Sequence, residues 1–338
     1  MSFSLDYAAI WALIIVTGVM IYVVLDGFDL GIGILFPALH KAQWRDHAMN
    51  SIAPVWDGNE TWLVLGGGGL LAAFPKAYAL LLPALYMPIF FMLTALILRG
   101  VAFEFRFKAE RSQFIWDWAF TAGSAAAAFF QGVILGTVVQ GMELQAGQYV
   151  GGGFAWFNPF SLFCGLAVMV GYALLGCGWL ILKTSGELQQ QCWRYGRRIF
   201  PALIIAITIV SIWTAFGEPA IRERWFSLPN FYWLSQIPLV TFILTLMIGY
   251  SLKREKREAL PFIGTIGLFL LSYLGLLVSV FPYAVPRVMS FHEAAAAPAS
   301  LQFSLVGVVI LLPIILIYTA INYRVFKGKV DQQAGYGH

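Results

Sequence analysis

Long apolar runs alternate with short charged segments along the whole chain. Nine runs contain no Asp, Glu, Lys or Arg, at residues 7–25, 61–75, 77–98, 118–142, 160–182, 199–217, 231–252, 259–286 and 294–323. A helix needs about 20 apolar residues to cross the hydrocarbon core of a bilayer, and eight runs have about that length or more. The pattern predicts an all-α polytopic membrane protein of nine transmembrane helices, which form a single transmembrane domain over residues 1–338.

The second apolar run is the weak point of this prediction, because it has only 15 residues. To cross the bilayer, its helix must begin upstream, near Ser51, and carry Asp57 and Glu60 into the membrane. The alternative is a re-entrant segment, which would move Lys41 and Arg45 to the other side.

Composition supports a membrane protein. Hydrophobic residues make up 60% of the chain and charged residues only 11%, whereas soluble domains carry roughly a quarter charged residues. The first eleven residues have no basic segment and no small-residue cleavage site, so the first run is predicted to be a retained helix rather than a signal peptide. The three cysteines match no zinc or disulfide spacing, and we expect no bound metal.

The basic residues predict an orientation. With nine spans, 17 of the 21 Lys and Arg residues fall on one side, and the other side holds only Lys76, Arg222, Arg224 and Arg287. Positive residues are enriched in cytoplasmic loops, so the N-terminus is predicted to be outside and the C-terminus cytoplasmic. A re-entrant second segment would reduce the bias to 15 against 6.

Four carboxylates are the main candidates for chemistry. Asp26 and Asp29 lie in DGFDLGIG, late in the first span, and Asp57 and Glu60 lie in WDGNETW, early in the second. Each pair is spaced i, i+3, which puts its members on one helix face. Both pairs fall in the cytoplasmic half of adjacent antiparallel helices. Ionisable groups inside a membrane are functional candidates by default, and these can pass protons.

The surroundings of these acids leave a structural alternative open. Arg99 ends the third span on the same side and is a candidate counter-ion, and Trp56 and Trp62 bracket the second acidic pair as a candidate wall against lipid. In the structural alternative, the acids cap helices and pair with Arg99 or with backbone amides. The four histidines, His40, His47, His292 and His338, lie outside the cores of the spans, so we expect no haem ligand and no catalytic residue in this chain.

Several ordered motifs carry a resemblance to a known family. They are DGFDLGIG, NSIAPVWDGNETWLVLGGGGLLAAFP, RGVAFEFR, WDWAF, NPFSLFCG, ILKTSGEL and PIILIYTAINYRVF. In this order they resemble subunit II of cytochrome bd-type (cyanide-insensitive type) quinol oxidases. The resemblance runs from about Asp26 to Phe326 and is densest in the first 190 residues.

The resemblance implies a function. It implies the haem-free second subunit of a respiratory electron-transport complex in the bacterial cytoplasmic membrane, which oxidises quinol and reduces dioxygen to water. Haems b and d and the quinol-oxidising loop would lie in subunit I, a nine-helix relative that forms a pseudo-symmetric heterodimer with this chain. Membrane lipids, a bound quinone or lipid and a small single-helix accessory subunit are further expected partners, and nucleic acid is not.

The resemblance also assigns roles to the acids. The acids of DGFD and WDGN, which are Asp26, Asp29 and Asp57 here, would be this subunit's share of a cytoplasmic proton route to the oxygen-reducing haem. Glu60 follows WDGN directly. It either takes up and releases protons itself or only tunes the proton affinity of Asp57. Two other functions use the same sequence features: a proton-coupled secondary transporter, and a purely structural assembly subunit in which the acids are replaceable.

Overall fold

The computed structural model describes residues 5–109, 111–145 and 148–330. Helices form most of this part of the chain, with two short antiparallel hairpins, β1–β2 and β3–β4. The elements in chain order are α1 (Tyr7–Leu35), η1 (Phe36–Ala38), α2 (Ala42–Asn50), α3 (Trp56–Ala73), α4 (Pro75–Arg106), α5 (Gln113–Gln140), β1 (Leu144–Gln145), β2 (Gln148–Tyr149), α6 (Pro159–Lys183), α7 (Gly186–Gly217), α8 (Pro219–Phe226), α9 (Asn230–Leu234), α10 (Gln236–Arg254), α11 (Ala259–Val280), β3 (Tyr283–Val285), β4 (Met289–Ser290), α12 (Phe291–Ala294) and α13 (Pro298–Val325).

Eight helical segments of the described residues are long and apolar enough to cross a membrane. They are α1 with η1, α4, α5, α6, α7, α9 with α10, α11 and α13. The second apolar run lies in α3, which is a shorter helix of 18 residues and falls outside this set. The fold is that of a multi-pass membrane protein.

Helix α3 does not begin near Ser51, as the sequence analysis expected, but at Trp56. Residues 51–55 form turns, and α2 is a separate short helix before them. Pro54 explains the break, because proline has no backbone N–H and disfavours helical backbone at the residue before it. Asp57 therefore lies in the first turn of its helix rather than six residues inside it.

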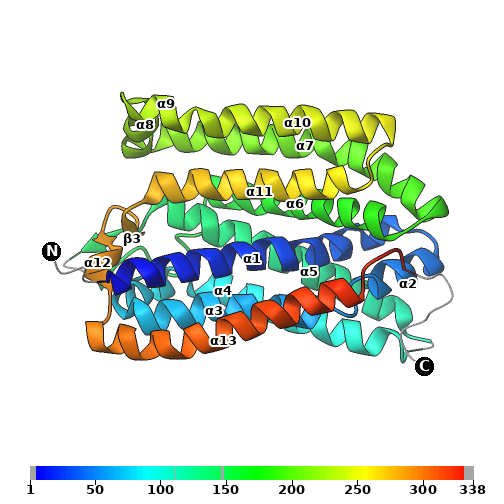
Figure 1. Cartoon of the computed structure of the whole chain (residues 1–338), viewed down its shortest axis with the longest axis horizontal. Coiled ribbons are helices and arrows are strands. Elements are labelled where there is room, and N and C mark those ends of the chain that lie inside the picture. The colour runs from blue at the N-terminus through cyan, green and yellow to red at the C-terminus, as the bar shows by residue number, and fades with distance from the viewer. Residues whose placement is uncertain (1–4, 110, 146–147, 331–338) are drawn as a thin grey trace.

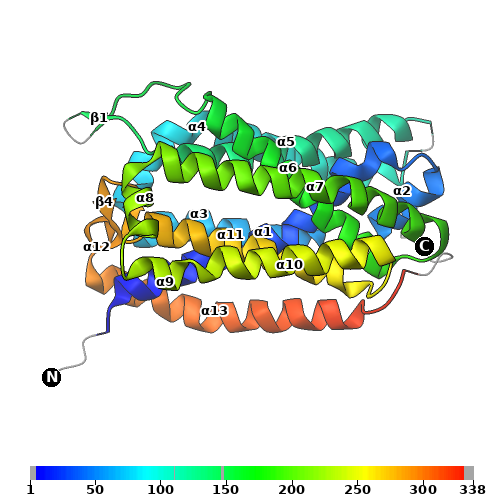
Figure 2. The same cartoon turned by 90° about the horizontal axis from the view of Figure 1, so that it is seen from above.

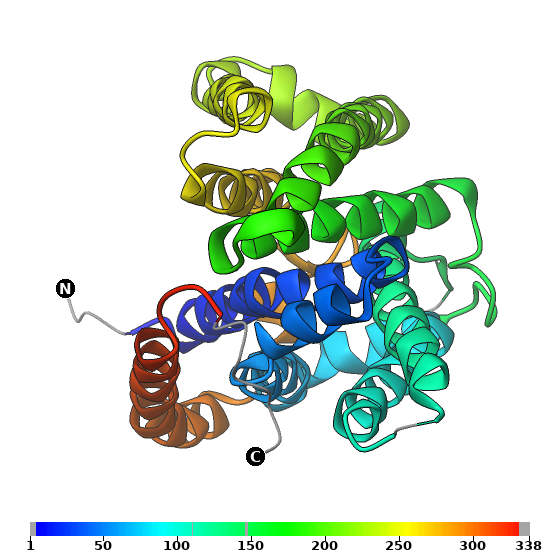
Figure 3. The same cartoon turned by 90° about the vertical axis from the view of Figure 1, so that its right-hand side faces the viewer.

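The long helices lie side by side, with short elements at both ends of the bundle. Helix α2 lies at one end, and α8, α9, α12 and the β3–β4 hairpin lie at the other (Figure 1); we name these the α2 end and the α8 end. Helix α1 packs against α3, α5 and α6, and α6 packs in turn against α7 and α11. Seen end-on, α1 is near the middle of the molecule (Figure 3), whereas α13 lies at the edge away from α4 and α5 (Figure 2).

Glycines let the central helices approach closely. A Cβ atom on Gly31 of α1 would overlap the carbonyl oxygen of Tyr172 in α6, and one on Gly176 would lie 2.6 Å from the carbonyl carbon of Gly31. In α3, Gly66 and Gly69 pack against α1, whereas Gly67 and Gly68 have nothing within 4 Å of a Cβ position. Small residues take this role in membrane helices because backbone contact maximises van der Waals packing.

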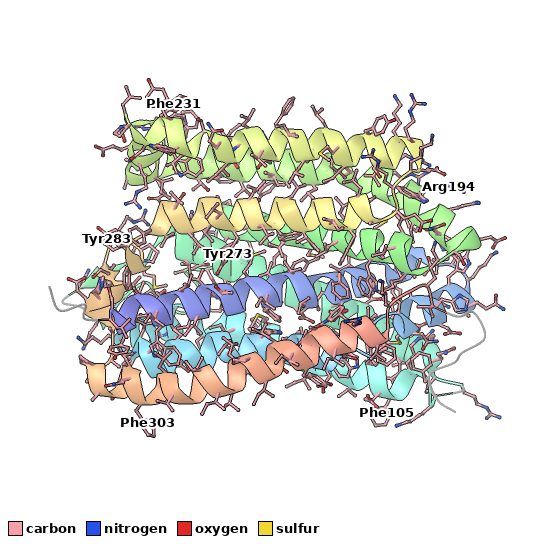
Figure 4. The ribbon with its side chains drawn as sticks, in the orientation of Figure 1. Phe105, Arg194, Phe231, Tyr273, Tyr283 and Phe303 are labelled. Atoms are coloured by element: carbon pink, nitrogen blue, oxygen red, sulfur yellow. The ribbon has the colours of Figure 1, made fainter. Side chains whose placement is uncertain are left out.

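The outer surface is apolar. Phe105, Phe231 and Phe303 project outward from three helices (Figure 4), and Phe303 is 81% exposed. Contiguous exposed apolar surface marks membrane or protein contact. The helix α13 is the extreme case, since none of its most apolar segment is buried within this chain.

A short segment after α13 crosses the α2 end as a strap (residues 326–330). The Val330 amide donates to the Lys183 carbonyl over 2.8 Å, and the Lys183 ammonium donates to the Phe326 carbonyl over 2.7 Å. Lys329 donates to the Thr184 carbonyl and pairs with Glu258, both over 2.9 Å. The strap thus connects α13 with the α6–α7 and α10–α11 turns.

The α1–α6 contact generates a stability prediction. We expect Gly31→Ala to destabilise the protein by about 1–3 kcal/mol, because the added methyl group forces two backbones apart. Gly307→Ala is the matched control, since Gly307 is in α13 and has open space at its Cβ position. Thermal unfolding in detergent measures both. Equal melting temperatures for the two variants would contradict this packing.

The strap generates a pH prediction. The hydrogen bond from Lys329 holds the pKa of Glu258 below its ordinary value of 4.5. A carboxyl with a lowered pKa stabilises the folded state above that ordinary value and loses this contribution as the pH falls. We expect hydrogen-exchange protection of the Val330 amide, corrected for intrinsic rates, to decrease below pH 4.5. Glu258→Gln should show reduced protection at neutral pH, whereas Glu255→Gln, which breaks the neighbouring pair with Arg197, should not.

Candidate functional site

The site is centred on the buried guanidinium of Arg99 in α4. Arg99 is 0% exposed, its Nη1 donates to Asp26 Oδ1 over 2.6 Å, and its Nη2 lies 3.3 Å from Glu60 Oε1. A buried charge without a partner costs several kcal/mol. The carboxylates of α1 and α3 therefore hold this cation in the bundle.

Asp29 lies one turn beyond Asp26 on α1, and its hydrogen-bond partners differ from those of Asp26. Asp29 Oδ2 accepts a hydrogen bond of 2.7 Å from Asn59 Nδ2, and the same amide also donates to the Leu25 carbonyl. The hydroxyl of Tyr323 in α13 donates to Asn59 Oδ1 over 3.0 Å. Four helices, α1, α3, α4 and α13, thus meet at this site.

Several buried polar atoms of the site have no hydrogen-bond partner among the described residues. They are Asp26 Oδ2, Asp29 Oδ1, Glu60 Oε1, Arg99 Nε and Arg99 Nη2. Buried polar groups in proteins are nearly always paired with protein atoms or with water. Unused acceptor positions on carboxylates give this site the capacity to take up water or a proton.

Glu60 and Asp57 lie at the edge of the site. The Glu60 side chain is 28% exposed, and Asp57 is exposed and makes no side-chain hydrogen bond or ion pair within the described part of the chain. Asn59 faces α1. Two residues along a helix rotate the side-chain direction by about 200°, so the side chain of Asp57 points away from α1. The structure brings together Asp26, Asp29, Glu60 and Arg99, but not Asp57.

An aromatic layer lies on the α2 side of Arg99. The Trp56 ring stacks on Phe103 at 5.0 Å, and the Arg99 guanidinium carbon lies 5.9 Å from the Trp56 ring centroid, which is within cation–π range. Phe120 continues the layer from Phe103 to Phe36. The second predicted wall residue, Trp62, is buried, and its indole N–H has no partner among the described residues.

A second ionic cluster lies beyond this layer. Arg106, seven residues or about 10 Å along α4, donates to Asp117 over 2.5 Å and to Asp46 over 2.7 Å. Arg45 pairs with Asp117 at 3.1 Å. Within the described residues, no hydrogen bond or ion pair connects the Arg106 cluster with the Arg99 site.

Sequence reasoning missed two polar residues of the site. Asn59 lies between the two acids of WDGNETW, and Tyr323 lies in the last family-like motif, so both were within segments already singled out. The described residues contain no group of three or more His, Cys, Asp or Glu side chains that could hold a metal ion. His292 pairs with Asp6 at the α8 end, and His338 lies outside the described residues.

Comparisons with known proteins agree with one another. The model of the family "Cytochrome bd terminal oxidase subunit II" matches residues 7–326. "Cytochrome bd ubiquinol oxidase subunit 2" of Bacillus subtilis (strain 168) is 28% identical, with 96% of this chain and 97% of that protein covered. "Cytochrome bd-I ubiquinol oxidase subunit 2" of Escherichia coli (strain K12) is also 28% identical, with 96% and 95% covered.

A solved structure shares the fold. It is described as the structure of bd oxidase from Geobacillus thermodenitrificans, and one of its chains superposes with a TM-score of 0.70 at 13% identity, over 95% of this chain and 98% of that chain. The family match extends over nearly the whole sequence and contains every residue of the Arg99 site. This chain therefore belongs to the cytochrome bd terminal oxidase subunit II family.

Proposed function

We propose that this chain is the haem-free second subunit of a membrane complex that oxidises quinol and reduces dioxygen to water. The observation that carries the proposal is the end-to-end family match over residues 7–326, supported by relatives that are named as subunit 2 of cytochrome bd ubiquinol oxidases. Haems b and d belong to the partner, subunit I. This chain then contributes structure and proton transfer rather than redox chemistry.

The proton route is proposed to enter at the α3 surface. Asp57 is exposed and Glu60 half-buried, three residues apart on the same helix. From Glu60, protons pass the Arg99 site to Asp29, whose carboxyl is held by a neutral amide and keeps one oxygen free of partners among the described residues. The phenylalanines of the aromatic layer argue against entry along α4 from the Arg106 cluster, because the rings of Phe36, Phe103 and Phe120 carry no exchangeable protons.

The proposed topology has nine crossings, with the N-terminus outside and the C-terminus in the cytoplasm of a bacterium. Helix α3 counts as the ninth, since 18 residues span about 27 Å at 1.5 Å per residue. The beginning of α1 and the end of α13 lie at opposite ends of the molecule (Figure 1), as an odd number of crossings requires. The α2 end is the cytoplasmic end because basic residues are concentrated there.

Lipid and quinone contacts are proposed along the outer faces. An apolar groove of about 250 Å³ lies between α6 and α7, lined by Phe163, Leu166, Val170, Ile205 and Ile209, among others. Its shape and chemistry suit an acyl chain or an isoprenoid tail. A small single-helix accessory subunit would pack on an exposed apolar helix such as α13.

The topology can be tested with a reporter enzyme that is active only outside the cytoplasm. Fused after Lys329, it should be silent, because the α2 end faces inward. Fused after Gln148, in the hairpin between α5 and α6, it should be active. The reverse pattern of activities would rule out the proposed orientation.

The proton route can be tested by quinol-driven oxygen consumption of the purified complex. We expect Asp29→Asn and Asp57→Asn to slow turnover about tenfold or more, since positioned proton transfer contributes roughly 10²–10⁴-fold, whereas Asp57→Glu should retain partial activity. Glu187→Gln is the control, because Glu187 pairs with Lys41 at the surface of the α2 end, away from the Arg99 site.

Haem content must be equal in all these preparations, because an assembly defect would also lower turnover. If Asp29→Asn and Asp57→Asn assemble normally and turn over like Glu187→Gln, the chain is an assembly subunit and the proton route lies elsewhere.

A further inference from the structure

A chain of polar side chains, two buried tyrosines and a half-buried glutamine, leads away from the Arg99 site into the middle of the bundle. The hydroxyl of Tyr172 in α6 donates to Gln131 Oε1 over 2.7 Å, and Gln131 Nε2 in α5 donates to the Tyr22 hydroxyl over 2.7 Å. Tyr22 and Tyr172 are only 3% and 1% exposed. Tyr22 lies on α1, one turn before Asp26.

The hydrogen bonds of this chain run from Tyr172 through Gln131 to Tyr22, the residue one turn from Asp26. The Tyr22 oxygen already accepts from Gln131, so its own proton requires a different acceptor. Asp26 Oδ2 is a buried acceptor without a partner among the described residues, and residues four apart on a helix are neighbours. The Tyr22 proton and the Asp26 Oδ2 acceptor therefore lie on neighbouring turns of α1.

We propose that Tyr22 is a positioning residue that donates its hydroxyl proton to Asp26, and that Gln131 and Tyr172 hold it in this orientation. Asp26 then accepts a hydrogen bond from Arg99 on one carboxylate oxygen and a hydrogen bond from Tyr22 on the other. It is the fixed anionic partner of Arg99, and Asp29 is the carboxyl that carries the exchangeable proton. This inference rests on the proposed proton route, because it divides the roles of two of its acids.

The two aspartates have different surroundings, although they share a helix face. Asp26 accepts from the Arg99 cation and, in this proposal, from Tyr22, whereas the only hydrogen bond to Asp29 from a described residue comes from the Asn59 amide. The other ionisable groups around the site are Glu60 of α3 and Tyr323 of α13. If the Gln131 amide were reversed, Tyr22 would donate to Gln131 and Asp26 would lose its second donor.

The test is infrared spectroscopy of the purified complex across a pH series, because a protonated carboxyl absorbs separately from an ionised one. Asp29→Asn removes the signal of Asp29 and serves as the background. In Tyr22→Phe/Asp29→Asn, we expect a protonated-carboxyl signal from Asp26 that appears about one pH unit or more higher than in the background. This corresponds to at least about a tenfold rise in proton affinity on loss of a hydrogen bond to a charged group.

Tyr273→Phe/Asp29→Asn is the matched control. Tyr273 is an inward-facing tyrosine of α11 (Figure 4). Its hydroxyl donates to the Val16 carbonyl of α1 and not to an acid. This control should match the background. If Tyr22→Phe does not assemble, Tyr172→Phe on the same background should give a smaller shift in the same direction.

Spectra of the Tyr22→Phe and Tyr172→Phe variants that match the Tyr273→Phe control would overturn the proposal. The spectra are recorded at equilibrium and require no turnover. Wild-type oxygen consumption by Asp29→Asn would therefore refute the proton route without affecting the assignment of the Tyr22–Asp26 contact, so the two failures are distinguishable.

Discussion

The burial of one positive charge organises this bundle. Arg99 has no exposed surface, and in an apolar medium its guanidinium requires anionic partners at hydrogen-bond distance. Those partners come from α1 and α3, so the register of three helices is fixed relative to one another. The Gly31–Gly176 contact then fixes α1 against α6. The two contacts lie on adjacent turns of α1, which also carry Asp26 and Asp29.

The two arginines of α4 divide the α2 end into separate polar compartments. Arg99 and Arg106 are seven residues apart, which is about two turns, so both face the bundle interior. Phe36, Phe103 and Phe120 lie between them in T-shaped contacts, and these three rings carry no hydrogen-bonding groups. The Arg106 cluster therefore fastens α2 to α4 and α5. The Arg99 site instead reaches the surface of α3 at the partly exposed side chain of Glu60. A polar group near the membrane surface is therefore not by itself an entrance for protons.

The sequence predicted the spans well and the site only in part, for a physical reason. Apolar runs of about 20 residues are recognisable because the bilayer requires them, and the short second run was recognised as weak. The turns over 51–55 were missed, although Pro54 was the available signal. The sequence does not predict how α3 is rotated about its axis, because lipid-facing and core-facing positions are both apolar. Asp57 was therefore expected inside the site, where Asn59 lies instead. The Tyr22–Gln131–Tyr172 chain was also unreadable, since its members lie on three helices far apart in sequence.

Polar contacts rather than apolar burial determine where α13 docks. Lipid tails are as apolar as the side chains of a helix, so there is no hydrophobic driving force between helices in a bilayer. Near its N-terminal end, the Leu301 carbonyl of α13 accepts from the Trp11 indole over 3.0 Å. At its other end, Asn322 donates to the Pro54 carbonyl over 2.8 Å and Tyr323 reaches Asn59. The strap then continues to Lys183 and Glu258. Because Asn59 also holds Asp29, the docking of this exposed helix and the orientation of a buried carboxyl depend on the same amide.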